Sequence, residues 1–184
     1  MARSLAAESS TTRAPTTRTY LIRVIPIAVT IGLALLAGWL VYSRLLATRG
    51  PFHWDEASHA TKGILFAQSI RKGEWLALLF DGYRQVLYPP LHSLSVATSF
   101  LLFGPSIQSA GLASLASYFL LAPVLYAAAH YLREDHREVA GVVAAVLSLA
   151  TPMLISFATQ TMLEMIGLLF LTLTILIYLK IMRE

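Results

Sequence analysis

The chain has 184 residues, of which 57% are hydrophobic and only 13% are charged, and its mean hydropathy is +0.65. Soluble domains carry about 25% charged residues, so this composition excludes an ordinary soluble domain and favours a multi-spanning membrane protein. The net charge of +4 is not gathered into a basic stripe with interleaved aromatic residues, which argues against nucleic-acid binding. Cysteine is absent, which excludes a disulfide framework and thiolate chemistry.

Residues 1–22 are rich in Ser, Thr, Ala and Arg and are predicted to form a flexible cytoplasmic tail. The first span is predicted over residues 24–46, where an uncharged apolar run reaches Ser43 and is long enough to cross a bilayer. The basic residues that precede it place the N-terminus in the cytoplasm. The apolar run is long for a signal peptide and has no clear cleavage site, which favours an uncleaved anchor.

Residues 47–105 are predicted to form an outer loop that carries two juxtamembrane helices. Asp55 is a good N-cap for the first helix, which runs to about Lys72 and ends at Gly73. Its apolar and polar residues separate onto two faces, as in a helix that lies on a membrane. The second helix is predicted over Pro89–Phe103. A helix of that length would be about 22 Å long, which is too short for a hydrocarbon core of about 30 Å.

Three further spans are predicted, over residues 107–131, 139–159 and 163–181. A charged turn at residues 133–138 separates the first two. The apolar segment from Val139 to Leu179 would be about 60 Å long as one helix, so we expect two spans with a break around Ser156 to Glu164. The predicted fold class is therefore all-α: an integral membrane protein with four transmembrane helices and two juxtamembrane surface helices.

Acidic residues mark the candidate site. With four spans, both termini are cytoplasmic, and Asp55, Glu56 and Glu164 lie on the same outer face. A structural interpretation exists for each: Asp55 caps a helix, Glu56 interacts favourably with the helix dipole, and Glu164 reaches water at the end of a span. An acid within an apolar run is costly, however, and usually faces a cavity or a partner. Both interpretations stay open.

The order of several short motifs resembles that of a known family. Trp-Asp-Glu, an amphipathic helix and Lys-Gly-Glu-Trp are followed by Tyr-Pro-Pro-Leu-His and an apolar run that ends in Leu-Phe-Gly. A span, a charged turn, a second span and Thr-Met-Leu-Glu-Met come next. From Arg23 onward this order resembles the N-terminal part of GT-C membrane glycosyltransferases, in particular the protein O-mannosyltransferase and aminoarabinose transferase group (glycosyltransferase 39/83-like). Residues 23–184 would then form a GT-C-like transmembrane module.

The resemblance implies transfer of a sugar from a polyprenyl-phosphate donor to an acceptor on the non-cytoplasmic side of a bacterial-type plasma membrane. Asp55 is the expected base, and Glu56 and Glu164 are expected to orient it. Asp55 and Glu56 are also the candidate ligands of a divalent metal cation. The expected substrate-binding residues are Lys62, Arg84, Tyr88 and His92.

Two departures from the family qualify this hypothesis. Leu87-Tyr88 stand where aminoarabinose-type members carry an acidic-basic pair, which argues against a metal site of that type. Family members are also several times longer, so we expect an incomplete module that is inactive alone and needs further transmembrane spans, from a partner chain or from the missing remainder. The main alternative is a non-catalytic membrane binding or assembly subunit. A truncated product and a small transporter are further alternatives.

Overall fold

The structure, a computed structural model, describes residues 17–85, 89–132 and 135–183. The chain is 85% helical, with no strand in the described ranges, which confirms the all-α class. The helices are α1 (Thr17–Val41), α2 (Trp54–Lys72), α3 (Trp75–Arg84), α4 (Pro90–Phe103), α5 (Ile107–Leu132), α6 (Arg137–Ala150), α7 (Pro152–Ala158) and α8 (Glu164–Ile181). A single π-helical turn over Tyr42–Leu46 extends α1.

Three helical segments are long and apolar enough to cross a membrane: Val24–Leu46, Ile107–Leu132 and Glu164–Ile181. This finding supports a membrane protein. The predicted span over residues 139–159 is instead a pair of helices, α6 and α7, which meet at an angle of 63° and make a fourth candidate only if the bent pair is counted as one span. The bend follows from Pro152, which has no N–H to continue the α6 ladder and begins α7.

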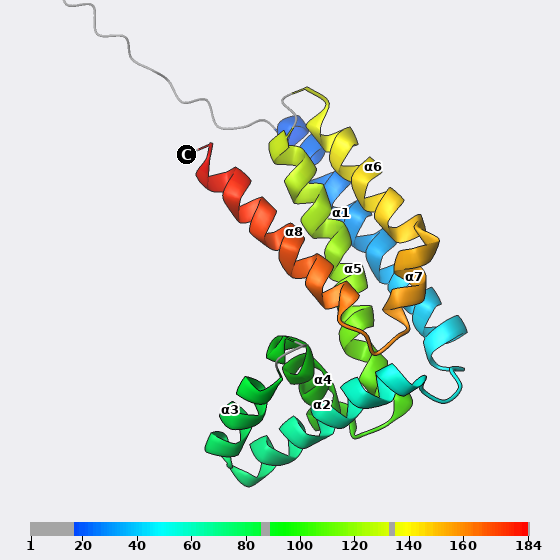
Figure 1. The fold of residues 1–184 in the computed structure, drawn as a ribbon. Coiled ribbons are helices and arrows are strands. Elements are labelled where there is room, and N and C mark those ends of the chain that lie inside the picture. The colour runs from blue at the N-terminus through cyan, green and yellow to red at the C-terminus, as the bar shows by residue number, and fades with distance from the viewer. Residues whose placement is uncertain (1–16, 86–88, 133–134, 184) are drawn as a thin grey trace, which may run out of the picture.

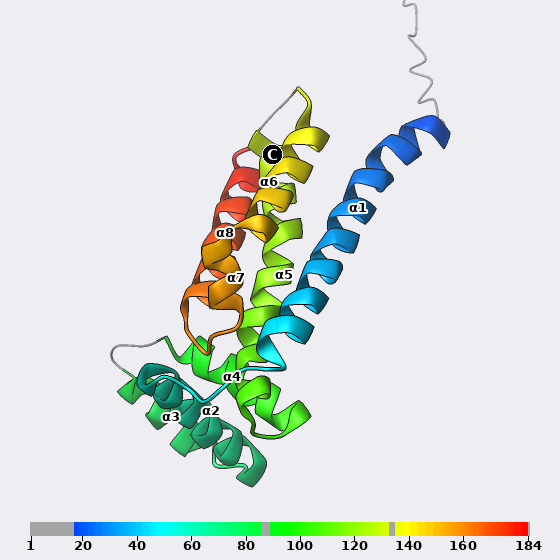
Figure 2. The same cartoon turned by 90° about the vertical axis from the view of Figure 1, so that its right-hand side faces the viewer.

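The long helices α1, α5, α6 and α8 form a bundle, and α2, α3 and α4 form a layer across one end of it (Figure 1). The turn between α7 and α8 reaches that same end, whereas the start of α1, the α5–α6 turn and the C-terminus lie at the other end (Figures 1 and 2). Helix α5 is central, because it packs against α1, α4, α6, α7 and α8.

Small residues let the neighbouring helices approach α5 closely, as in many membrane bundles. Ala113, Ser114 and Ala122 are buried on α5, and the fully buried Leu46 from the end of the first span packs against Gly111 of α5. The Tyr118 hydroxyl donates a hydrogen bond of 2.6 Å to the carbonyl of Leu149. This bond satisfies one of the carbonyls left without a helical partner at the end of α6.

The layer at the end of the bundle is held by contact between α2 and α4. Phe66 and Val96 are buried at this contact, and Gly63 lets the two backbones approach. A Cβ atom added to Gly63 would lie 2.5 Å from Val96 Cγ1, so no larger residue fits without displacement. Helix α2 ends at Gly73, whose φ of 71° is the left-handed conformation expected of a C-terminal cap.

The sequence predictions for this layer were right in part. Helix α2 begins at Trp54 with His53 as its N-cap, so the prediction that Asp55 is the N-cap is wrong. Asp55 lies in the first turn instead, where its charge interacts favourably with the helix dipole. Helix α4 matches the predicted second helix to within one residue. Helix α3 was not predicted and carries a strongly one-sided apolar face.

We predict that Gly63→Ala destabilises the protein by about 1–3 kcal/mol, because the methyl group meets Val96 in a packed contact. The matched control is Gly32→Ala, since a Cβ at Gly32 meets no atom within 4 Å. Thermal unfolding in detergent micelles measures both variants. Equal stability of the two would contradict the close contact between α2 and α4.

Candidate functional site

An ion pair joins the layer to the end of the bundle. The Arg49 guanidinium lies 2.6 Å from both carboxylate oxygens of Glu56 on α2. The same guanidinium donates to the carbonyl of Thr159, and the backbone N–H of Thr161 donates to Glu56 Oε1 at 2.9 Å. The Arg49–Glu56 pair therefore binds the α7–α8 turn to the start of α2.

Glu56 is almost fully buried, with 2% of its surface exposed. Burial raises the pKa of the Glu56 carboxyl, but the hydrogen bonds from Arg49 and from the backbone N–H groups of Thr161 and His53 outweigh it and lower the pKa overall. Glu56 is thus an ionised carboxylate whose oxygens are already engaged. Glu56 therefore holds the start of α2 against Arg49 and the α7–α8 turn.

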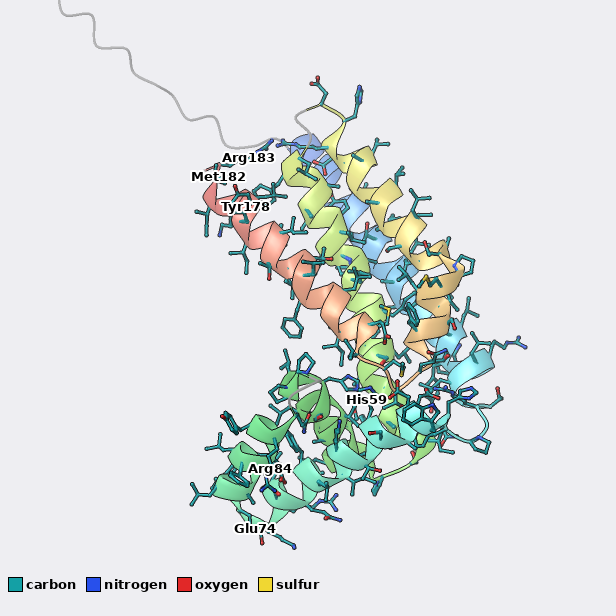
Figure 3. The ribbon with its side chains drawn as sticks, in the orientation of Figure 1. His59, Glu74, Arg84, Tyr178, Met182 and Arg183 are labelled. Carbon is teal, nitrogen blue, oxygen red and sulfur yellow. The ribbon has the colours of Figure 1, made fainter. Side chains whose placement is uncertain are left out.

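A polar stripe runs along α2 beside this ion pair. Asp55, His59 and Lys62 are spaced at i, i+4 and i+7, which places them on one face of the helix. His59 is buried at the junction of the layer and the bundle (Figure 3). Burial lowers the pKa of His59, and the charge of Lys62 lowers it further. The charges of Asp55, Glu164 and Glu56 act in the opposite direction. The charges of the three acids expected from the sequence therefore all act on one histidine.

A second histidine faces the first. His92 on α4 is 2% exposed, and its ring meets that of His59 edge to face, with the centroids 4.8 Å apart. Burial, together with His59 and Lys62, lowers the pKa of His92 to about 4. His92 is therefore uncharged at neutral pH. Neither of its ring nitrogens has a hydrogen-bond partner among the described residues.

Glu164 is the first residue of α8 and lies half-buried at the same place. Its Oε2 atom and the hydroxyl of the fully buried Thr161 are enclosed without a hydrogen-bond partner among the described residues. Buried polar atoms are nearly always hydrogen-bonded, so each of these atoms, like the His92 nitrogens, is suited to a polar ligand or ordered water.

The other expected site residues do not join this cluster. Arg84 ends α3, is exposed, and places its guanidinium 4.3 Å from the centre of the Phe80 ring, away from His59 (Figure 3). Tyr88 lies outside the described residues. No group of three or more His, Asp or Glu among the described residues is placed to hold a metal ion. The metal role expected of Asp55 and Glu56 stays a prediction.

Arg49 was not identified from the sequence, and Thr161 was given no role. Arg49 looked like one of several basic residues in a loop, and its partner Thr159 is 110 residues away. An arginine directly after a span and seven residues before paired acids was the only available signal. No hydropathy pattern pairs it with a distant turn.

The cluster as a whole combines one fixed ion pair, the half-exposed Asp55, the cationic Lys62 and uncharged His92. Such a set can accept a proton and contact an anion at the same place. No family model, curated protein or solved structure matches the chain.

We predict that Arg49→Gln lowers the free energy of unfolding by about 3–5 kcal/mol, because it leaves the Glu56 charge buried without its partner. The double variant Arg49→Gln, Glu56→Gln should recover a large part of this loss. The control is Arg44→Gln, which removes an exposed cation nearby. Unfolding in detergent measures all four proteins. Equal stability of the Arg49 and Arg44 variants would contradict the role of the ion pair.

We predict that His92 makes the fold sensitive to acid. Between pH 6.5 and about 4 the unfolded chain binds a proton that folded His92 does not, so stability falls as the pH falls through this window. The total loss is up to about 3 kcal/mol. In His92→Phe the stability should change less with pH over this range. His136→Asn, which alters an exposed histidine, is the control and should keep the wild-type slope.

Proposed function

We propose that this chain is a GT-C-like membrane glycosyltransferase module that transfers a sugar from a polyprenyl phosphate to an acceptor hydroxyl. One observation supports this proposal above the others: Asp55, His59 and Lys62 share a face of α2, and the start of α8, which carries Glu164, lies at the same end of the apolar bundle. The phosphate of a membrane lipid lies at that depth, at the ends of the spans.

The proposal requires four spans, with the bent pair α6–α7 as the third. Helix α6 advances about 21 Å, and α7, bent by 63°, adds about 5 Å along the same direction, so the pair covers about 26 Å of a core of about 30 Å. The α2–α4 layer would then lie on the non-cytoplasmic surface, and both termini would be cytoplasmic. Basic residues favour cytoplasmic loops, so the cations of the 47–105 loop count against this orientation. Glu56 neutralises one of them, Arg49.

Helix α3 would rest in the membrane interface. Its apolar side chains Trp75, Leu76, Leu79, Phe80 and Tyr83 are all exposed, Leu76 and Tyr83 by 84% and 86%. A short helix with a one-sided apolar face and aromatic residues suits the boundary between headgroups and acyl chains. This placement would keep the layer, and with it Asp55, at the level of the lipid phosphate.

In the proposed reaction the acceptor oxygen forms a bond to the anomeric carbon of the sugar. The bond from that carbon to the phosphate oxygen breaks, and the lipid phosphate leaves with the electron pair. Asp55 accepts the hydroxyl proton as the acceptor attacks. Asp55 suits this role better than Glu56, because the carboxylate of Glu56 is buried in its pair with Arg49.

Lys62 is the proposed contact for the leaving phosphate. It lies seven residues beyond Asp55 on the same face, so about 10 Å of helix separates the two positions. That spacing leaves room for the acceptor hydroxyl at Asp55, the anomeric carbon next to that hydroxyl, and the leaving phosphate beyond the carbon, near Lys62. A cation at the phosphate stabilises the charge that develops as the bond breaks. Arg84 is too far from the cluster for this role.

Glu56 and Glu164 are proposed as positioning residues. Glu56 fixes the first turn of α2, and Glu164 acts on His59 from the start of α8. A divalent cation between Asp55 and Glu56 fits poorly, because Arg49 and two backbone N–H groups already occupy the Glu56 oxygens. We therefore derive no step through a metal ion.

The stripe supplies one wall of a transfer site, so further spans from a partner chain are proposed for the opposite wall. Catalysis of this kind depends on holding donor and acceptor together in one geometry. The alternative function, a non-catalytic assembly subunit, would use the exposed α3 face as a protein contact. The glycosyltransferase needs the carboxylate of Asp55 for turnover, whereas the assembly subunit does not.

We predict that Asp55→Asn lowers turnover by about 10²-fold or more in membranes that contain the chain and its natural partners. The substitution removes the base and keeps the size of the side chain, so stability should change by less than about 1 kcal/mol. The measurement is release of lipid phosphate from a panel of polyprenyl-phosphate sugars.

The matched control is Asp81→Asn, which removes a half-buried carboxylate from α3 and should leave turnover unchanged. Full activity of the Asp55→Asn protein would end the base assignment. If the wild type releases no lipid phosphate from any donor in these membranes, the assembly-subunit alternative replaces the proposal.

A further inference from the structure

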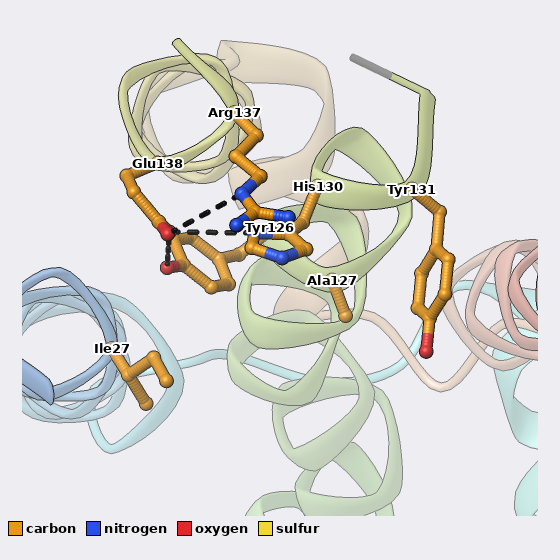
Figure 4. Close-up of a pocket in the computed structure, with 7 residues that line it drawn as sticks. All are labelled: Ile27, Tyr126, Ala127, His130, Tyr131, Arg137 and Glu138. Atoms are coloured by element: carbon orange, nitrogen blue, oxygen red, sulfur yellow. Dashed lines mark hydrogen bonds and ion pairs between the residues drawn. The ribbon is translucent and has the colours of Figure 1, made fainter. Parts of the chain in front are cut away.

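A cavity lies at the end of the bundle opposite the polar stripe. Figure 2 shows that α1 leans away from α5 and α6 toward the end that carries the α5–α6 turn. In this wedge the structure has a cavity of about 340 Å³. Ile27 lines it from α1, Tyr126 and His130 from α5, and Arg137 and Glu138 from α6 (Figure 4).

The polar wall of the cavity is built around Glu138. The Tyr126 hydroxyl donates to Glu138 Oε2 at 2.7 Å, and His130 Nδ1 lies 3.3 Å from the same oxygen (Figure 4). Tyr126 is itself fixed, because its ring packs on Gly141, where an added Cβ would lie 2.6 Å from the ring. The carboxylate is thus held in place before any ligand arrives.

Arg137 adds a positive charge beside this carboxylate. Its Nε atom lies 3.9 Å from Glu138 Oε1, which is too long for a hydrogen bond. The two side chains remain 43% and 23% exposed, so both charges face the opening of the wedge. The two groups therefore form a loose, partly exposed ion pair with no hydrogen bond between them.

We propose that this wedge binds a zwitterionic phospholipid whose headgroup carries a primary ammonium, namely phosphatidylethanolamine. The ammonium would donate to Glu138 Oε1, and the phosphate would accept from the Arg137 guanidinium. The two fixed charges sum to zero, as do those of this headgroup. An anionic headgroup would leave Glu138 uncompensated, and a quaternary ammonium has no N–H to donate.

The apolar part of the wedge suits an acyl chain. A second cavity of about 210 Å³ lies further along the same two helices, lined by Leu33, Leu36 and Leu40 of α1 and by Val146 and Leu149 of α6. From Arg137 to Leu149 the α6 axis advances about 18 Å. An acyl chain that reaches the middle of the bilayer covers about 15 Å, half of the hydrocarbon core. Leu36 is nine residues, about 180° of helix rotation, from Ile27, so the second cavity opens on another side of α1. A lipid in the seam between α1 and the bundle would therefore place its headgroup and the start of one acyl chain in the first cavity.

This site is independent of the proposed glycosyl transfer, since it uses none of the same residues. Lipid in the seam would hold α1 against the bundle at the end where the helices diverge. Between membrane helices, packing must come from such contacts, because the surrounding lipid is as apolar as the side chains.

The test is native mass spectrometry of the full chain, extracted in micelles with equal amounts of phosphatidylethanolamine, phosphatidylcholine and phosphatidylglycerol. We expect one molecule of phosphatidylethanolamine to be retained at least about tenfold more than either other lipid. Glu138→Gln and Arg137→Gln should each abolish this preference, and Ile27→Trp should displace the lipid by filling the wedge.

The control is Arg183→Gln, at the same end of the bundle as the cavity but just beyond the end of α8 (Figure 3), which should keep the preference. Glu138→Gln keeps an acceptor for Tyr126, and circular dichroism checks that each variant is folded. Equal retention of the three lipids by the wild type would overturn the proposal. A preference that survives Glu138→Gln and Arg137→Gln together would do so as well.

Discussion

The structure depends on one buried ion pair that lies between two parts of the chain. Burying two charges is costly, and only good geometry and further hydrogen bonds compensate for it. Here Arg49 and Glu56 meet at 2.6 Å, and the leftover hydrogen-bonding capacity is used by the backbone of the α7–α8 turn. That turn ends one helix and begins another, so its carbonyl and N–H groups need partners from outside. The ion pair supplies them, and the layer is thereby fixed to the bundle.

The same ion pair gives two adjacent acids, Asp55 and Glu56, different surroundings. Neighbouring residues on a helix point about 100° apart, so Glu56 faces the Arg49 side chain and Asp55 faces the stripe with His59. Glu56 is shielded from solvent, whereas Asp55 is half-exposed. A buried acid that is fixed in place and a half-exposed acid that can reach solvent therefore stand next to each other. The rigid one determines where the other points.

Much of this fold could be predicted from the sequence. The apolar runs that became α5 and α8 are long enough to be recognised by length alone, and Gly73 and Gly104 indicated the ends of α2 and α4. Helix α3 was missed because its ten residues include Asp81 and Gly82, and a short segment of that composition after a glycine looks like a loop. The bend at Pro152 was visible as a proline, but the angle of the pair depends on tertiary packing.

The candidate site was harder to predict than the spans. The sequence singled out Asp55, Glu56, Glu164 and His92; in the structure the His92 ring contacts His59, and the charges of the three acids act on His59. It could not reveal that Arg49 would engage Glu56, because the decisive partners of both are backbone groups of a turn more than 100 residues later. Backbone groups carry no side-chain signal. A residue that binds them looks like any other charge in a loop.

The separation between the two sides of this junction has a consequence for biogenesis. Arg49 and Glu56 are seven residues apart and can pair as soon as they leave the translocation machinery, whereas Thr159 is made 110 residues after Arg49. At about 5–20 residues per second, the ribosome needs roughly 5–20 s to cover that interval. During this delay the ion pair can form, but its backbone partners at Thr159 and Thr161 have not yet been made. Once the α7–α8 turn has been made, its backbone can bond to Arg49 and Glu56. The polar stripe therefore takes its final position only when α8 begins to enter the membrane.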